Sequence, residues 1–111
     1  VFKLLNEKIN LKGIAHITGG GLTENIPRIL PNECSVKIKK GTWPSLPIFD
    51  TLKDLGNVEE EEMYQAFNMG IGMVFIVDSD SVDSVEKALK NITNIYTIGE
   101  VIEGENIVHY N

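Results

Sequence analysis

Residues 13–28 read GIAHITGGGLTENIPR, and this stretch decides how the rest of the sequence is interpreted. A short apolar run, Ile14 to Ile17, leads into three consecutive glycines, and a polar segment that can open a helix follows. Three glycines in a row cost conformational entropy on folding, so we expect backbone that bends sharply or closely approaches another group. A strand, a glycine loop and a helix N-terminus together can form a site for an anion such as phosphate. The spacing leaves open the alternative of a tight strand-to-helix turn without a ligand.

The composition limits the class of protein and the kinds of partner that the chain can bind. The 111 residues suit one domain, and 42% apolar with 23% charged residues is ordinary for a globular protein. A net charge of -6 argues against nucleic acid, and no apolar run is long enough to span a bilayer. Cys34 is the single cysteine, so no disulfide can form within the chain, and no cysteine–histidine cluster predicts a metal site.

Helical and strand periodicities alternate along the chain. Apolar spacing predicts helices near residues 2–9, 23–30, 47–56, 57–66 and 82–90, and strands at 14–17, 34–39, 72–77, 95–102 and 107–110. We expect Pro27 in the first turn of its helix and Asn57 as the N-cap of the acidic helix. The run 72–77 is the most apolar and predicts a central strand, and 103–106 predicts a hairpin turn.

These elements predict the fold class. The segment 72–102 forms a strand–helix–strand unit, and a hairpin follows it. We therefore expect an α+β domain in which helices pack on a mixed, largely antiparallel sheet. The glycine run does not match the G-x-G-x-x-G fingerprint of dinucleotide-binding folds.

Polar residues beside the glycine loop are the first candidates for chemistry. His16 shares a strand face with Ile14 and is a candidate ligand donor or general acid–base. Asn25 and Arg28 lie three residues apart on one helix face, and Arg28 can bind phosphate with two donors. For each residue a purely structural role is the alternative: a histidine bonded to a carbonyl, or a surface pair of Arg28 with Glu24.

A second candidate segment is Phe67-Asn68-Met69-Gly70-Ile71-Gly72. Asn68 can offer both a donor and an acceptor at the sheet edge, and the glycines allow close backbone approach. A helix C-terminal cap is the alternative. Trp43 is expected to cover an apolar surface near a turn. None of these residues completes a catalytic set, because no nucleophile has a matched base and no Walker P-loop is present.

Several motifs together resemble one enzyme family. They are the run 16–21 (HITGGG), the run 24–28 (ENIPR), Leu30-Pro31, Gly56-Asn57-Val58, Glu62-Met63-Tyr64, the run 67–73 (FNMGIGM) and Ile98-Gly99. In this order they resemble the C-terminal domain of the phosphoribosylformylglycinamidine cyclo-ligases, also called aminoimidazole ribonucleotide synthetases. The resemblance covers nearly the whole chain and implies the C-terminal domain fold of that superfamily, which is partly ferredoxin-like.

The resemblance implies a reaction and roles for the candidate residues. The family converts formylglycinamidine ribonucleotide and ATP, with magnesium, to aminoimidazole ribonucleotide, ADP and phosphate. His16 and Asn25 would be catalytic residues that orient the formyl amide region. The residues that would bind substrate or phosphate are Thr18, Gly19, Gly20, Gly21, Arg28, Asn68 and Gly70. No residue is expected to bind a metal.

The resemblance also implies a larger protein. Residues 1–111 would be a single domain, the C-terminal one of a two-domain cytoplasmic enzyme that is a homodimer at full length. The sequence starts at Val1 without a methionine, which favours a piece of a longer chain. The N-terminal ATP-binding domain would be missing, so this piece alone is expected to be inactive and to bind no cofactor.

Two alternatives remain open at this point. The first is the same domain of a related ATP-dependent enzyme: formylglycinamidine ribonucleotide synthetase, selenophosphate synthetase, thiamine-monophosphate kinase or a hydrogenase maturation factor. The second is a stand-alone regulatory domain that binds a small anion.

Overall fold

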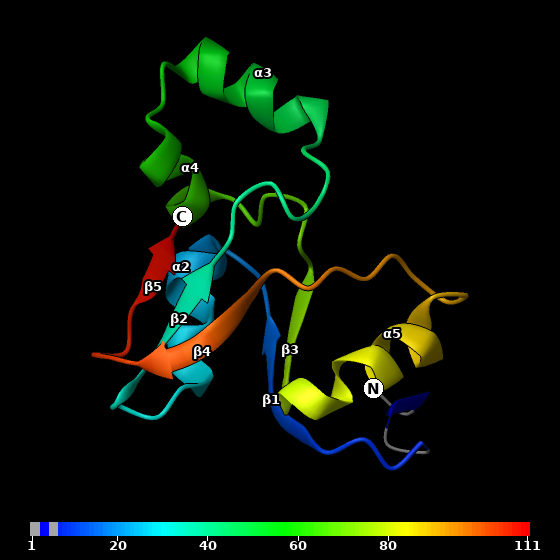
Figure 1. Ribbon diagram of the computed structural model, residues 1–111. Coiled ribbons are helices and arrows are strands. Elements are labelled where there is room, and N and C mark those ends of the chain that lie inside the picture. The colour runs from blue at the N-terminus through cyan, green and yellow to red at the C-terminus, as the bar shows by residue number, and fades with distance from the viewer. Residues whose placement is uncertain (1–2, 5–6) are drawn as a thin grey trace.

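The computed structural model describes residues 3–4 and 7–111, and its mixture of helices and strands confirms the α+β class. The helices are α2 (Gly21–Asn25), α3 (Pro47–Gly56), α4 (Glu60–Ala66) and α5 (Val82–Leu89), with 3-10 turns η1 (Pro27–Ile29) and η2 (Ser79–Ser81). The strands are β1 (Leu11–His16), β2 (Cys34–Ile38), β3 (Met73–Val77), β4 (Gly99–Glu103) and β5 (Val108–Tyr110) (Figure 1). The helix predicted at residues 2–9 lies partly outside the described residues.

The strands are mixed and largely antiparallel, as predicted, but they are divided between two sheets. Strand β1 pairs antiparallel with β3, and the second sheet has the order β4-β2-β5. The prediction that residues 72–77 form a central strand was wrong, because β3 has only β1 beside it among the described strands. Residues 95–98, the first part of the strand predicted at 95–102, have no regular structure, and a groove separates them from the free edge of β3. The predicted strand–helix–strand unit therefore bridges two sheets.

The predicted C-terminal hairpin was also wrong. Strand β4 runs antiparallel to β2, whereas β5 runs parallel to β2 on its other side. In the connecting turn, the amides of Gly104 and Asn106 donate to the carbonyls of Glu33 and Cys34, at 3.0 and 2.9 Å. The turn therefore crosses the start of β2, and this strand lies between the two segments that were expected to pair.

Two helix starts differ from the prediction. Helix α2 begins at Gly21 rather than at residue 23 or 24, and Pro27 opens η1 instead of lying in the first turn of an α-helix. Asn57 ends α3 with a left-handed φ of 50°, and Glu59 is the N-cap of α4. Asparagine tolerates this backbone better than most residues, which explains why it caps the preceding helix.

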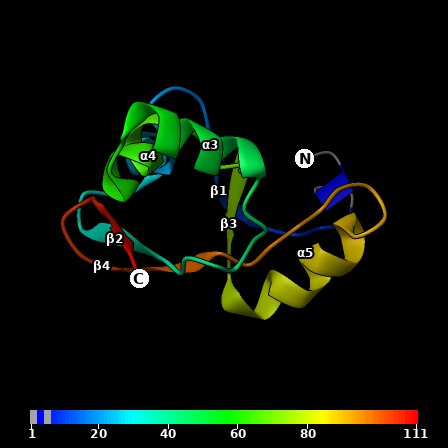
Figure 2. The ribbon, with the colours of Figure 1, turned by 90° about the horizontal axis from the view of Figure 1, so that it is seen from above.

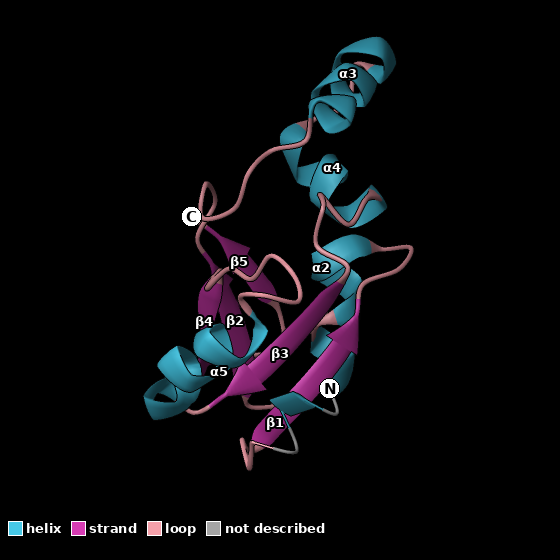
Figure 3. Ribbon diagram, turned by 90° about the vertical axis from the view of Figure 1, so that its right-hand side faces the viewer, coloured by secondary structure: helices cyan, strands magenta, loops and turns pink. Residues whose placement is uncertain are grey.

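Helix α3 projects from the rest of the molecule (Figures 1 and 3). None of its residues is buried, and Leu55 is 82% exposed. It contacts α4, and its Phe49 ring lies 6.0 Å from the ring of Phe67, the residue that follows α4. No helix in the described part of the chain combines the length and apolarity needed to cross a membrane.

The buried apolar residues form two clusters. The larger one joins α2 to both sheets and includes Leu22, Ile26, Val36 and Ile38. The smaller one includes Val85 and Leu89 of α5, with Leu11, Phe75 and Val77 of the two-stranded sheet packed against it. Figure 2 shows α5 on the opposite side of β3 from α4. Val36 and Ile38 lie two residues apart on β2, and both are buried.

Asn106 joins the C-terminal turn to the segment after α2. Its side-chain amide lies within hydrogen-bond distance of three carbonyl oxygens, those of Pro27 at 3.2 Å, Leu30 at 3.1 Å and Pro31 at 3.3 Å. Its backbone has a left-handed φ of 66°. The amide therefore stabilises a chain crossing that no backbone ladder holds.

We expect Asn106→Asp to lower the free energy of unfolding by about 1–3 kcal/mol, because a carboxylate would face three carbonyls in place of a donor. Asn106→Gly keeps the left-handed backbone and removes the amide, so it should cost less than Asn106→Asp. Urea denaturation of both variants measures the difference, with Asn91→Ala, an exposed asparagine, as the control. Equal stability of Asn106→Asp and the parent chain would contradict this role.

Candidate functional site

The glycine loop connects the end of β1 to the start of α2. The amide of Gly21 donates to the carbonyl of Thr18 at 3.0 Å, which closes a turn over residues 18–21. Gly20 and Gly21 have left-handed φ angles of 97° and 62°, which glycine adopts without strain. The amides of Gly19 and Gly20 have no hydrogen-bond partner among the described residues. Two backbone donors are therefore available at the corner between strand and helix.

The three glycines differ in what surrounds them. A Cβ atom on Gly21 would collide with the carbonyl oxygens of Tyr64 and Phe67 at the end of α4. A Cβ on Gly20 would meet the Glu24 side chain, whose carboxylate lies against this face of the loop. A Cβ on Gly19 would meet nothing within 4 Å. The open side of the loop is therefore at Gly19.

Asn25 holds the loop from inside. It is 4% exposed, and its side-chain amide donates to the carbonyls of Gly21 at 2.8 Å, Thr18 at 3.2 Å and Gly19 at 3.3 Å. Its carbonyl oxygen accepts hydrogen bonds from the Thr18 hydroxyl at 3.2 Å and from Arg28 at 3.3 Å. The polar groups of Asn25 are thus bonded to the protein itself.

Arg28 lies on the surface beside the loop. One guanidinium nitrogen, Nη1, donates to Asn25, which confirms that residues 25 and 28 share a face although η1 begins between them. Among the described residues no ion pair between Arg28 and Glu24 is found. Arg28 is exposed, and the loop offers two amides that have no partner among the described residues. A guanidinium and backbone amides are donors of the kind that suits an anion.

The second predicted segment lies against the first. The amide of Ile17 donates to the carbonyl of Gly72 at 3.0 Å, and the Phe67 carbonyl touches Gly21. Within the segment, the Asn68 side-chain oxygen accepts from the Gly70 amide at 2.8 Å. Met69 and Gly70 have left-handed φ angles of 55° and 93°. Asn68 therefore shapes a turn after α4 and does not itself cap the helix, which ends at Ala66 with Phe67 as its C-cap.

Trp43 holds this turn in place. Its indole nitrogen donates to the carbonyl of Met69 at 3.0 Å, and its ring packs on the larger core cluster. The prediction that Trp43 covers an apolar surface near a turn is confirmed. Met63 is buried, and Met69 is partly buried against the larger core cluster.

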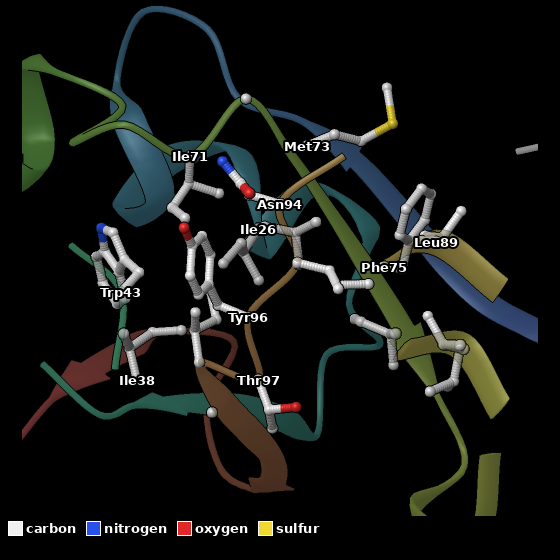
Figure 4. Close-up of a pocket in the computed structure, with 18 of the residues that line it drawn as sticks. Ile26, Ile38, Trp43, Ile71, Met73, Phe75, Leu89, Asn94, Tyr96 and Thr97 are labelled. Carbon is white, nitrogen blue, oxygen red and sulfur yellow. The ribbon is translucent and has the colours of Figure 1, made fainter. Parts of the chain in front are cut away.

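His16 stands apart from the loop donors. It is exposed at the end of β1 and, with Gly70, borders a groove of about 790 Å³ between β3 and residues 93–101. The walls of the groove are mainly apolar, with Ile26, Ile38, Ile71, Trp43 and Tyr96 visible in Figure 4. The structure thus brings Thr18, the glycines, Asn25 and Arg28 together, and places His16 and Gly70 on a neighbouring surface.

A cluster behind the loop escaped the sequence analysis. The hydroxyls of Thr23 and Tyr110 lie 2.8 Å apart, and Thr23 also donates to the Tyr64 carbonyl at 3.2 Å. The rings of Tyr64 and Tyr110 pack with centroids 4.5 Å apart. Thr23 lies within the decisive stretch, but its partners are far away in the sequence, so no local pattern could have revealed them.

Burial perturbs both phenols of this cluster. Desolvation, opposed by the hydrogen bond to Thr23, raises the pKa of Tyr110 to about 12. Burial and the nearby Glu60 carboxylate also raise the pKa of Tyr64, against the opposing effect of Lys40. Both side chains are therefore neutral donors or acceptors at ordinary pH.

The geometry defines an α+β domain with a glycine loop, held by Asn25, beside an apolar groove, and comparison with known proteins gives its family. The family model described as "AIR synthase related protein, C-terminal domain" matches residues 1–111, and the chain belongs to this family. The match confirms the resemblance on which the sequence interpretation rests.

Curated relatives agree with this family. The chain is 57% identical over 99 residues to a phosphoribosylformylglycinamidine cyclo-ligase of Acetivibrio thermocellus, covering 88% of this chain and 29% of the relative. It is 52% identical over 98 residues to a protein of the same name in Caldanaerobacter subterraneus, covering 87% and 29%. It is also 48% identical over 96 residues to the bifunctional purine biosynthetic protein purD of Dictyostelium discoideum, covering 86% and 12%. The chain spans less than a third of the length of each of these relatives.

The loop geometry predicts different outcomes for two alanine substitutions. Gly21→Ala should lower the free energy of unfolding by more than about 2 kcal/mol, because the methyl group collides with two backbone carbonyls at a left-handed residue. Gly19→Ala should change it by no more than about 0.5 kcal/mol, because the position is open. Urea denaturation of the two variants is the measurement, and equal losses would contradict the packing.

The Tyr110 phenol predicts a stability change at high pH. Its pKa is about 12 in the fold, whereas an unfolded tyrosine ionises near 10. The folded chain therefore retains this proton between pH 10 and 12, and stability falls as the pH rises through that window. Tyr110→Phe should make the fall shallower than in the parent chain. Urea midpoints at pH 9 to 12 test this, and the comparison cancels the lysines that titrate in both proteins.

Proposed function

We propose that this chain is the C-terminal domain of a phosphoribosylformylglycinamidine cyclo-ligase and forms one wall of its ligand site. The observation that carries the proposal is the loop corner itself. Among the described residues the amides of Gly19 and Gly20 have no partner, and the Arg28 side chain is exposed. The family includes cyclo-ligases that match this chain at 57% and 52% identity. The proposed substrates, formylglycinamidine ribonucleotide and ATP, both carry phosphate.

In the proposed reaction, the formyl amide oxygen of formylglycinamidine ribonucleotide takes the γ-phosphoryl group of ATP, and ADP leaves. A substrate nitrogen then attacks the activated carbon, the C–O bond breaks, phosphate departs and the imidazole ring closes. This chemistry needs positioning and charge stabilisation more than a protein nucleophile. The amides of Gly19 and Gly20 and the side chain of Arg28 are suited to holding a phosphate of either substrate.

The other candidate residues take supporting or neighbouring roles in the proposal. Asn25 orients the Thr18 and Gly19 carbonyls and Arg28, so its contribution to catalysis is to fix the donors of the loop. Thr18 supports Asn25 through its hydroxyl. His16 and Gly70 face the groove, where an exposed imidazole can donate to the formyl amide region. Asn68 fixes the amide of Gly70.

Magnesium accompanies ATP in the proposed reaction as a neutralising charge on the phosphates. In the described ranges no three histidine, cysteine, aspartate or glutamate side chains lie close enough to hold a metal ion. The proposal therefore assigns magnesium to no residue of this chain.

The proposal includes a second domain. The chain covers 29% of the length of its cyclo-ligase relatives, which leaves room in those proteins for an ATP-binding domain that closes the cleft. We place the complete enzyme in the cytoplasm as a homodimer that forms through this other domain. Residues 1–111 alone then lack one wall of the site and should not turn over substrate.

The test compares the full-length protein, its Gly19→Ala variant and residues 1–111 alone, each assayed for aminoimidazole ribonucleotide from formylglycinamidine ribonucleotide, ATP and magnesium. The full-length protein should be active and the isolated chain inactive. Gly19→Ala should lower kcat/KM about tenfold or more at unchanged stability, because a methyl group occupies the open side of the loop. Normal kinetics of Gly19→Ala would show that the loop is structural only, and an inactive full-length protein would reject the function.

A further inference from the structure

The cluster of Thr23, Tyr64 and Tyr110 contains a hydrogen-bond chain with a defined direction. The Thr23 hydroxyl has one proton, and the Tyr64 carbonyl can only accept. While Thr23 donates to that carbonyl at 3.2 Å, the neutral Tyr110 hydroxyl is the donor to Thr23 across the 2.8 Å contact. The chain therefore runs from Tyr110 through Thr23 to the backbone at Tyr64.

The last acceptor of this hydrogen-bond chain, the Tyr64 carbonyl, contacts the glycine loop. The Tyr64 carbonyl that accepts from Thr23 is one of the two carbonyls packed against Gly21. Thr23 lies two residues after Gly21 in α2, so its hydroxyl fixes α2 and α4 to each other at the point where the loop ends. A shift of this carbonyl would change the space available to Gly21 and move the turn that Asn25 holds.

Tyr110 is itself held firmly. Strand β5 pairs with β2, where Tyr110 stands opposite Ile38, and the Tyr110 ring packs on the Tyr64 ring. Its ring also belongs to the layer packed on the larger core cluster. The phenol hydroxyl is thus presented to Thr23 by a strand that lies 87 residues further along the sequence.

We propose that Tyr110 is a positioning residue for the glycine loop, acting through Thr23 and the Tyr64 carbonyl. It sets the distance between α2 and α4 and so keeps the amides of Gly19 and Gly20 in their ligand-binding arrangement. The expected consequence for catalysis rests on the proposed function, whereas the effect on the loop backbone does not.

The experiment uses the full-length protein that contains residues 1–111 and three variants of it. Tyr110→Phe removes the first hydroxyl of the hydrogen-bond chain, Thr23→Val removes the second with little change of shape, and Thr23→Ser keeps the second hydroxyl. Steady-state kinetics with formylglycinamidine ribonucleotide and ATP are corrected for the folded fraction. We expect kcat/KM per folded molecule to fall about tenfold in Tyr110→Phe and in Thr23→Val, and less than twofold in Thr23→Ser.

The double variant separates positioning from a general loss of stability. If both hydroxyls act through one chain, Tyr110→Phe with Thr23→Val should cost no more than either change alone. Effects that multiply would show that the two residues act independently and would overturn the proposal. So would kcat/KM values per folded molecule that stay within twofold of the parent in both single variants.

Amide hydrogen exchange gives a readout without catalysis. In the same full-length proteins, the peptide that covers residues 18–25 should exchange about tenfold faster in Tyr110→Phe and Thr23→Val than in the parent. Tyr64→Phe is the matched control, because it removes a nearby phenol hydroxyl that makes no hydrogen bond among the described residues and keeps the carbonyl. Unchanged exchange in the first two variants would overturn the proposal. If the parent shows no cyclo-ligase activity but exchange changes as expected, the proposed function fails and the positioning role stands.

Discussion

The close contact between Gly21 and the end of α4 is the constraint on which the site depends. Two backbone carbonyls, from Tyr64 and Phe67, occupy the space that any side chain at position 21 would need. This contact brings α2 against α4, and α4 leads directly into the Asn68 turn and β3. β3 pairs with β1, the strand that leads into the loop. The strand before the loop and the helix after it therefore both pack on the segment that runs from α4 to β3. Because Gly21 has no side chain, the glycine loop and the segment after α4 can pack directly against each other.

The sequence predicted the elements better than their pairing. Helix α3 and the acidic helix α4 follow from apolar spacing and first-turn glutamates, which are local signals. The position of β5 does not follow from local signals. The turn at 103–106 has the composition of a hairpin turn, but its amides donate to the carbonyls of Glu33 and Cys34. Similarly, the apolar run at 72–77 indicated a strand correctly but could not show that residues 94–98 leave its edge unpaired.

The candidate site was predicted in part for the same reason. Thr18, the glycines, Asn25 and Arg28 are neighbours in the sequence and remain neighbours in the fold. The sequence could not show that the Asn25 side-chain amide donates to three loop carbonyls. Nor could it show that the Gly21 amide donates within the turn, because both features depend on backbone geometry. The hydrogen bond from Tyr110 to Thr23 also depends on α4 and β5, which are far from the loop in the sequence.

The order of the strands has a consequence for how this domain folds. Among the described strands, no two that are consecutive in the chain pair with each other, since the ladders are β1 with β3, β2 with β4 and β2 with β5. Each ladder therefore closes a long loop of chain before any of its hydrogen bonds forms, which is typical of slowly folding topologies. The glycine corner, which is contiguous in sequence, acquires its final shape only when α4 and the C-terminal strand have arrived. The part of the domain that looks most local is thus expected to mature last.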